Sequence, residues 1–297
     1  MKVGIAGTGR MGAAIATRLL GQGHAVTVWN RTAAKIAPLV AAGANAAGSP
    51  AALAGASETI ITILTDAGAI DAAYNGPSGL LAGDVKGRLF MEMSTVRPET
   101  AQALAEKVRA KGAAIVECPV GGTTGPARDG KLFGFVGATD ADFARAKPLL
   151  EQMCRRIEHV GPVGAGASMK LAINLPLLVY WQALGEALSL ARPLGLEPAR
   201  IMDIFADTSG APNMLKNRAA SIATQLGGGD VAPTNEVDVI RKDLRTMLEE
   251  ARALGVALPV TARALECFDR AARDGLGGAD CTKMPAYWVE RGGRTKD

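Results

Sequence analysis

Short apolar segments alternate with helix-like segments over the first half of the chain. The apolar segments, which we predict to be strands, cover residues 2–6, 25–29, 59–64, 88–93, 113–116, 132–136 and 156–160. Between them lie Ala-rich segments whose apolar residues recur at helical spacing, as at Met11, Ile15 and Leu19. This alternation is typical of an α/β fold with a doubly wound parallel sheet, and we expect the last two strands to extend the same sheet.

The strand pattern stops after Gly161, and the rest of the chain has the pattern of helices. Helix-like periodicity covers residues 166–191, 196–205, 235–254 and 259–273. We therefore predict an α/β domain over residues 1–163 and an all-α domain over residues 164–297, which begins with a long interdomain helix. A cleft between two such domains is a usual place for a small-molecule site.

The most apolar part of that long helix, residues 171–184, contains Asn174, Pro176 and Gln182. It is shorter than the roughly 18 apolar residues that suggest a membrane span, so we interpret it as a buried helix and expect no membrane contact. Its apolar surface exceeds what one small helical domain can easily cover. This favours a homodimer or a homotetramer.

Gly7, Gly9 and Gly12 form a G-x-G-x-x-G motif directly after the first predicted strand and at the start of the first predicted helix. In this context the motif is typical of the Rossmann fold. The first glycine permits the tight turn, the second lets a pyrophosphate approach the backbone, and the third packs helix against strand. The helix N-terminus, at Arg10 and Met11, then offers amides to the phosphates. We therefore predict dinucleotide binding at residues 7–12.

The end of the second predicted strand indicates which dinucleotide is bound. NAD-preferring sites usually carry Asp or Glu there to bind the ribose 2′-hydroxyl, whereas this chain has Asn30, Arg31 and Thr32, with Lys35 one turn further on. The guanidinium of Arg31 can stack on adenine and bind a 2′-phosphate, and the other three residues can supply further donors. The sequence therefore predicts NADP(H) as the cofactor.

Composition and charge narrow the class of protein further. The net charge of +4 is mild and not clustered, which argues against nucleic acid as a partner. The cysteines lack C-x-x-C spacing and neither histidine lies in a cluster of possible ligands, so we predict no metal site. Widely spaced cysteines are typical of free thiols in a reducing compartment, and the N-terminal segment lacks a signal-peptide core. We therefore expect a cytoplasmic protein.

Lys170 and Asn174 follow the last predicted strand and lie four residues apart. Residues at this spacing share one face of a helix, so the ammonium and the amide can reach one oxygen of a bound molecule. A lysine in such a position can donate a proton to a nascent alkoxide. An isolated K-x-x-x-N pattern, however, is more often a surface lysine next to an unrelated asparagine.

Further segments, in the expected order, resemble the β-hydroxyacid dehydrogenase family. Besides the glycine motif, residues 117–132 resemble the substrate-binding segment of that family, Gly164-x-Gly166-x-x-x-Lys170-x-x-x-Asn174 resembles its catalytic segment, and Lys242-Asp243-Leu244 resembles its K-D-L motif. The resemblance covers essentially the whole chain. It implies an NADP-dependent oxidoreductase that interconverts a small aldehyde or keto acid and the corresponding hydroxy acid.

The resemblance also implies a role for each site residue. Lys170 would be the general acid or base, Asn174 would orient the substrate oxygen, and Lys242 would approach both the nicotinamide and the substrate. The expected contacts of the substrate carboxylate are the backbone amides of Gly121 and Gly122 and the side chain of Thr123. The expected cofactor contacts at the ends of the strands before the substrate segment are Leu64, Thr65 and Thr95.

The substrate segment departs from the pattern of the family, so the substrate stays open. The usual P-V-S-G-G appears here as Pro119-Val120-Gly121-Gly122-Thr123, without the serine, which Thr123 or Thr124 would have to replace. Residues 126–130 are closer to the glyoxylate/succinic semialdehyde reductase branch than to the 3-hydroxyisobutyrate branch.

Two alternative functions stay open at this point. One is an imine reductase of similar fold, but such enzymes usually carry Asp or Tyr where Lys170 stands. The other is a non-catalytic dinucleotide-binding protein, in which the presence of Lys170, Asn174 and Lys242 together would be unexplained.

Overall fold

The computed structural model describes residues 1–291, so the last six residues of the predicted helical domain 164–297 lie outside the described part. The chain forms two compact units, Met1–Ala172 and Ile173–Asp297. We predicted the domain boundary at residue 163. The contacts divide the chain further on, inside the long helix α8 (Ala165–Ala191), because this helix starts in the first unit and continues in the second.

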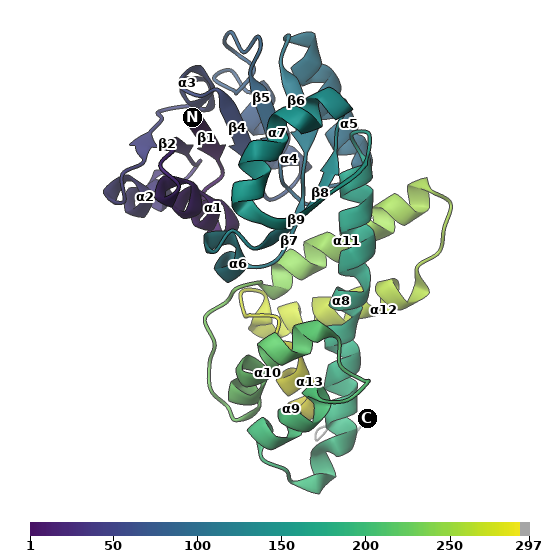
Figure 1. Ribbon diagram of the computed structural model, residues 1–297. Coiled ribbons are helices and arrows are strands. Elements are labelled where there is room, and N and C mark those ends of the chain that lie inside the picture. Colours follow the sequence, from purple (N-terminus) through teal and green to yellow (C-terminus); the bar gives the residue numbers. More distant parts are fainter. Residues whose placement is uncertain (292–297) are drawn as a thin grey trace. The chain divides into compact units, whose positions relative to one another are not determined.

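A parallel sheet forms the centre of the first unit (Figure 1). Its parallel strands are β1 (Lys2–Ala6), β2 (Ala25–Trp29), β3 (Asn45–Ala46), β4 (Thr59–Thr62), β5 (Leu89–Glu92) and β6 (Ala114–Glu117). Their order is β3-β2-β1-β4-β5-β6, so the chain builds the sheet outward in both directions from β1. This confirms the predicted doubly wound, Rossmann-type fold.

The far edge of the sheet differs from the prediction. As expected, β8 (Leu132–Gly137) and β9 (Cys154–Gly161) extend the sheet, but β8 runs antiparallel to β6 and to the short strand β7 (Val120–Gly121). The expectation of an entirely parallel sheet is therefore wrong at this edge. The β6–β8 connection holds only β7 and the short helix α6 (Thr124–Arg128), whereas α7 (Asp140–Met153) supplies the long crossover that the parallel β8–β9 pair needs.

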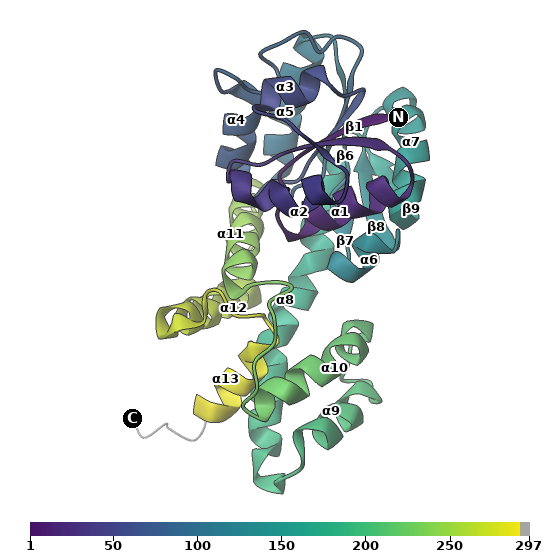
Figure 2. The same cartoon turned by 90° about the vertical axis from the view of Figure 1, so that its left-hand side faces the viewer.

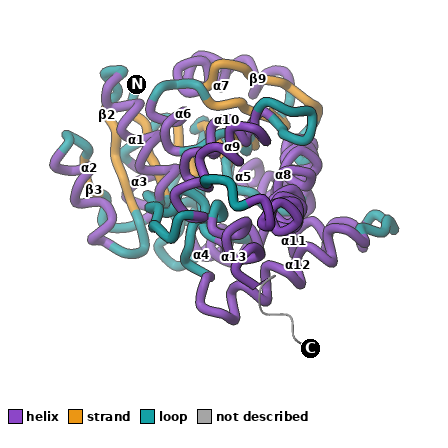
Figure 3. The backbone as a smooth tube through the Cα atoms, turned by 90° about the horizontal axis from the view of Figure 1, so that it is seen from below, coloured by secondary structure: helices purple, strands orange, loops and turns teal. Residues whose placement is uncertain are grey.

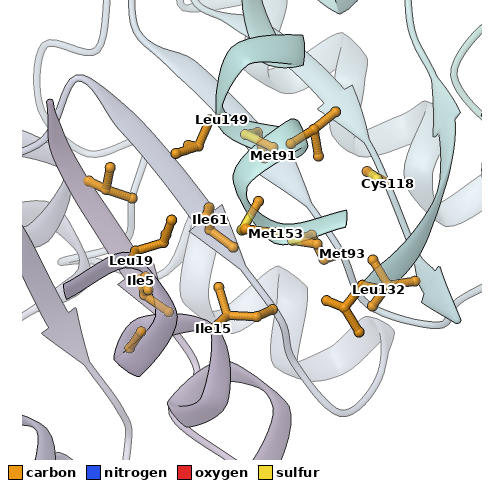
Figure 4. Packing of buried hydrophobic residues seen from close by; sticks show 14 of the residues in the cluster. Ile5, Ile15, Leu19, Ile61, Met91, Met93, Cys118, Leu132, Leu149 and Met153 are labelled. Atoms are coloured by element: carbon orange, nitrogen blue, oxygen red, sulfur yellow. The ribbon is translucent and has the colours of Figure 1, made fainter. Parts of the chain in front are cut away.

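Helices cover both faces of this sheet, and their apolar side chains make two cores. The remaining helices of the unit are α1 (Arg10–Gly21), η1 (Ala33–Ile36), α2 (Ala37–Ala41), α3 (Pro50–Gly55), α4 (Ala67–Asn75) and α5 (Pro98–Ala110). One core joins Ile15 of α1 and Leu149 of α7 to Ile61 of β4 (Figure 4). The other joins α3, α4 and α5 to Ile60, the neighbour of Ile61 in the same strand. Adjacent strand residues thus point to opposite faces, and both are buried.

The described part of the second unit, which ends at Arg291, consists of helices joined by loops, with one isolated β-bridge between Glu236 and Asp280 (Figure 3). After α8 come η2 (Arg192–Leu194), α9 (Pro198–Ala206), α10 (Asn213–Leu226), α11 (Val237–Ala253), α12 (Pro259–Ala271), η3 (Ala272–Leu276) and α13 (Lys283–Arg291). Helices α9 and α10 pack side by side (Figure 2). Trp288 Nε1 of α13 donates to Gln182 Oε1 of α8 at 2.6 Å, and Asp269 of α12 pairs with Arg241 of α11 at 2.6 Å.

The segment Ala165–Leu194, which joins α8 and η2, is long and apolar enough to cross a membrane by length and composition alone. One such helix is weak evidence for a membrane span, since core helices meet the same criterion. Only 39% of its most apolar window is buried, so our interpretation of a buried helix holds for one part of its surface only. Leu178, Trp181 and Leu184 are buried, whereas Ile173 and Leu190 are exposed.

Candidate active site

The glycine motif forms a tight turn at the carboxyl end of β1. Gly7 has φ 96°, and its N–H donates to the carbonyl oxygen of Trp29 in β2 at 3.0 Å. A Cβ at Gly7 would overlap the carbonyl oxygen of Ile63, and a Cβ at Gly12 would overlap the carbonyl oxygen of Gly7. Both positions therefore require glycine: Gly7 because of its positive φ and the chain after β4, and Gly12 because α1 starts directly against the end of β1.

The space in front of this turn fits a pyrophosphate. Gly9 is exposed, and no atom outside its immediate neighbours comes within 4 Å of the position that its Cβ would take. It is the N-cap of α1 and no side chain caps that helix, so this helix N-terminus can offer backbone amides to an anion. Thr8 Oγ1 is buried and makes no hydrogen bond within residues 1–291. The turn thus offers donors and an open approach to an anionic group.

The end of β2 lies beside the glycine turn. Asn30 Oδ1 accepts from the N–H of Thr8 at 3.1 Å, and Asn30 Nδ2 donates to the carbonyl oxygen of Thr32 at 3.1 Å. Asn30 therefore holds the turn against β2. The side chains of Arg31, Thr32 and Lys35 are exposed, with Lys35 in η1. The structure thus places the predicted 2′-phosphate residues one after another at this end of the strand.

A buried polar network joins the ends of β4 and β5. The N–H of Leu64 donates to Ser94 Oγ at 2.8 Å, and the N–H of Ser94 donates to Glu92 Oε1 at 2.7 Å. Thr62 Oγ1 hydrogen-bonds Glu92 Oε2 and also contacts Tyr74 OH at 2.8 Å. Burial raises the pKa of the Glu92 carboxyl. The network fixes the two loops that carry the predicted cofactor contacts Leu64, Thr65 and Thr95.

The predicted substrate segment follows β6. Of the two glycines whose amides we expected to bind the substrate carboxylate, Gly121 lies in strand β7 opposite Phe133 of β8. Gly122 makes the turn with φ 126°, and a Cβ there would lie 2.9 Å from Leu132 Cδ2. Thr123 is the N-cap of α6, and its side chain makes no capping hydrogen bond. The turn itself is thus formed by Gly122 and Thr123.

Lys170 and Asn174 lie one turn apart in α8, as their spacing predicts. Lys170 belongs to the first compact unit and Asn174 to the second. Lys242 lies in α11 of the second unit, where its Nζ is 2.5 Å from Asp243 Oδ1. Asp243 itself is buried.

Sequence reasoning assigned no role to two buried carboxylates of the first unit, Glu92 and Glu117. Both are 2% exposed, and they face each other in the register of β5 and β6. One signal was available in the sequence, because each glutamate ends an otherwise apolar strand that is predicted to be buried. A charged residue in such a position needs hydrogen-bond partners, which mark it as part of a built site.

Comparison with known proteins finds a matching protein family for each of the two parts of the chain. Residues 2–161 match the family described as the NAD binding domain of 6-phosphogluconate dehydrogenase. Residues 164–288 match the NAD-binding domain of NADP-dependent 3-hydroxyisobutyrate dehydrogenase. The chain belongs to the β-hydroxyacid dehydrogenase family. It is an oxidoreductase of this family and has a domain that binds a nicotinamide dinucleotide.

Two curated relatives match almost end to end. The 2-(hydroxymethyl)glutarate dehydrogenase of Eubacterium barkeri is 34% identical over 99% of this chain and 96% of the relative. Glyoxylate/succinic semialdehyde reductase 1 of Arabidopsis thaliana is also 34% identical, over 94% of this chain and 96% of the relative. Both relatives are named for reactions of small carbonyl or hydroxy acids.

Solved structures share the fold over nearly the whole chain. A 3-hydroxyisobutyrate dehydrogenase of Salmonella typhimurium superposes with TM-score 0.86 at 26% identity, over 97% of this chain and 99% of that chain. Psf3 in complex with NADP+ and 2-OPP gives TM-score 0.85 at 28% identity, with the same coverage. A reductive aminase of Aspergillus terreus, solved with NADPH and ethyl levulinate, gives TM-score 0.64 at 26% identity, also over 97% and 99%.

Proposed function

We propose that this protein is an NADPH-dependent reductase of small aldehyde or keto acids, which it interconverts with the corresponding hydroxy acids. The observation that carries the proposal is the position of Lys170 and Asn174 one turn apart at the start of α8, in a chain whose glycine turn fits a pyrophosphate. The substrate class is that of glyoxylate, succinic semialdehyde or 3-hydroxyisobutyrate. It is supported by the names of the relatives.

The mechanism assigns one task to each group of residues. Bound NADPH supplies the hydride that reduces the carbonyl carbon. Lys170 donates the proton that the new alkoxide needs, and in the reverse direction its neutral amine accepts that proton. Asn174 orients the same oxygen through its amide. The Gly122 turn and the hydroxyl of Thr123 bind the substrate carboxylate, and the ammonium of Lys242 adds positive charge to the site.

A panel of carbonyl substrates tests this function directly. The purified protein is incubated with NADPH and either glyoxylate, succinic semialdehyde or a cyclic imine, and NADPH oxidation is followed. We expect turnover with at least one of the aldehyde acids. The likeness to the reductive aminase makes the imine the critical comparison. Turnover with the imine alone would replace the proposal by an imine reductase, and NADPH binding without any turnover would favour a non-catalytic protein.

We propose that Arg31 sets the preference for NADPH. Its side chain is exposed at the end of β2, next to Thr32, where an NAD-specific site would carry a carboxylate. A hydrogen bond between charged groups contributes about 1.5–3 kcal/mol, so Arg31→Asp should lower the ratio of kcat/KM for NADPH to that for NADH by about 100-fold. The ratio is measured with one substrate at fixed pH and ionic strength.

Arg155→Asp is the matched control for this variant. Arg155 is exposed on β9, away from the end of β2, so the substitution makes the same change in net charge without touching the predicted 2′-phosphate site. We expect its cofactor ratio to equal that of the wild type. An unchanged ratio in Arg31→Asp would contradict the assignment of Arg31.

A further inference from the structure

Glu117 ends strand β6 with its carboxylate at the N-terminus of α8. Its Oε1 accepts hydrogen bonds from the N–H groups of Gly164 at 2.5 Å, Gly166 at 2.8 Å and Ala167 at 3.3 Å. The helix begins at Ala165, so these donors belong to its first turn and the residue before it. Amides in this position have no partner inside the helix, and a carboxylate both satisfies them and interacts favourably with the helix dipole.

Glycines make the room that this contact needs. A Cβ at Gly137 of β8 would overlap Glu117 Oε1. A Cβ at Gly166 would overlap the carbonyl oxygen of Phe135 and lie 3.2 Å from Glu117 Oε1. Gly164 has φ 103°, which other residues rarely adopt. The Gly164-x-Gly166 pattern before Lys170 thus brings the start of α8 against the ends of β6 and β8.

Within the first unit, the Glu117 carboxylate links the predicted substrate segment to the helix that carries Lys170. On one side, Glu117 is followed directly by Cys118 and the predicted substrate segment up to Thr123. On the other side, it holds Ala167, which lies three residues before Lys170 in the same helix. We propose that Glu117 is a positioning residue: it fixes the first turn of α8, and with it Lys170, against the strand end that carries the substrate segment. This inference rests on the proposed function of Lys170.

The inference can be tested because the charge of the Glu117 carboxyl changes with pH. Burial raises the pKa of this carboxyl to about 7, although the amides of Gly164, Ala167 and Gly166 oppose the shift. The titratable groups facing it are Glu92 of β5, whose charge raises the pKa further, and the buried thiol of Cys118, whose own pKa lies well above its usual range. Above pH 7 the charged carboxylate holds the helix. Below pH 7 protonation weakens its pull on the amides.

The decisive variant is Glu117→Gln, which keeps the shape of the side chain and removes its charge. A displacement of a reacting group by about 1 Å lowers turnover by up to about 100-fold, so we expect kcat to fall by about 10- to 100-fold. The Kd for NADPH should stay within about threefold, because the cofactor turn is at the end of β1 and not of β6. Wild-type kcat should decline below pH 7, and this acidic limb should be absent in Glu117→Gln.

Thr139→Ala is the matched control. Thr139 is the N-cap of α7, and its Oγ1 accepts from the N–H of Asp142 at 3.2 Å. The variant also removes a helix-capping acceptor from the first unit, but at a helix that carries none of the predicted site residues. We expect a lower Tm with unchanged kcat and an unchanged pH profile. If Thr139→Ala lost as much kcat as Glu117→Gln for the same loss of Tm, the loss of kcat would reflect lower stability alone. That result would overturn the positioning role.

Amide hydrogen exchange separates this inference from the proposed function. In Glu117→Gln, the amides of Gly164, Gly166 and Ala167, which donate to Glu117 in the wild type, should exchange faster, whether or not a substrate is known. Unchanged exchange there would overturn the inference, as would an acidic limb that persists unaltered in the variant. If Glu117→Gln does not fold, the wild-type protein still decides: a kcat without any decline near pH 7 overturns the inference. Wild-type protein that turns over no carbonyl substrate would instead overturn the proposed function.

Discussion

Lys170→Ala should lower kcat for carbonyl reduction by about 1,000-fold while the Kd for NADPH changes by no more than a few-fold. A positioned general acid contributes about 10²- to 10⁴-fold to such a reaction, and in this site Lys170 is the proposed donor. The cofactor turn is built separately, at the junction of β1 and α1. The loss should therefore appear in kcat and not in binding. Steady-state kinetics with the best aldehyde acid, and a fluorescence titration with NADPH, measure both quantities.

Two further variants make this prediction specific. Lys170→Arg keeps a positive charge, but a guanidinium does not release its proton, so it should be nearly as inactive as Lys170→Ala. Lys147→Ala removes an exposed lysine of α7 that pairs with Glu151 at 3.8 Å, and it should leave kcat unchanged. Near-wild-type turnover by folded Lys170→Ala would refute the proposed mechanism. Full activity of Lys170→Arg would show that only charge is needed.

The parallel strands of the sheet could be predicted because each strand can be recognised from the hydrophobicity of its own residues. A strand buried on both faces must be mostly apolar, and the segments of β1 and β2 are apolar apart from Lys2 at the start of β1 and Thr27 in β2. Their predicted bounds are confirmed, Lys2–Ala6 and Ala25–Trp29. The strand predicted to end at residue 64 ends at Thr62, where the chain turns out of the sheet and the N–H of Leu64 binds Ser94 instead.

The direction of β8 was not visible in its own residues. Hydrophobicity predicts a strand over 132–136, but its orientation depends on the structure that the connection before it forms. Only β7 and the short helix α6 lie between β6 and β8, and a chain of this kind returns antiparallel. The connection, residues 118–131, is long enough for a crossover by its number of residues, so the orientation depends on the pairing of β7 with β8, which the residues of β8 alone do not show.

The site was predictable where one segment builds it and unpredictable where several segments do. The glycine turn is contained in residues 7–12, so its geometry follows from the motif. Glu117, by contrast, binds the amide of Gly164, 47 residues further along the chain. Asn30 shows the same limit, because its side chain binds the N–H of Thr8, 22 residues earlier, and this contact depends on the pairing of β1 with β2.

Substitution by alanine should affect the stability of the protein at Gly12 but not at Gly9. Gly12→Ala places a methyl group against the carbonyl oxygen of Gly7 and 2.9 Å from Ile63 Cγ2, so it should destabilise the protein by about 1–3 kcal/mol even without cofactor. Gly9 has φ −66° and open space around its Cβ position, so Gly9→Ala should leave the Tm of the cofactor-free protein unchanged.

The Kd for NADPH then distinguishes Gly12, which the packing of α1 requires, from Gly9, which we propose lies next to the pyrophosphate. A methyl group at Gly9 would stand where we propose that the pyrophosphate approaches the backbone, so Gly9→Ala should raise the Kd for NADPH by about 100-fold. Gly21→Ala serves as control, because Gly21 is exposed in the same helix with no atom within 4 Å of its Cβ position. Its Tm should equal or exceed that of the wild type, and its Kd for NADPH should be unchanged. If Gly9→Ala bound NADPH as tightly as the wild type, the pyrophosphate would have to lie elsewhere. If Gly12→Ala kept the full Tm, the close packing of α1 on β1 would not be what requires glycine there.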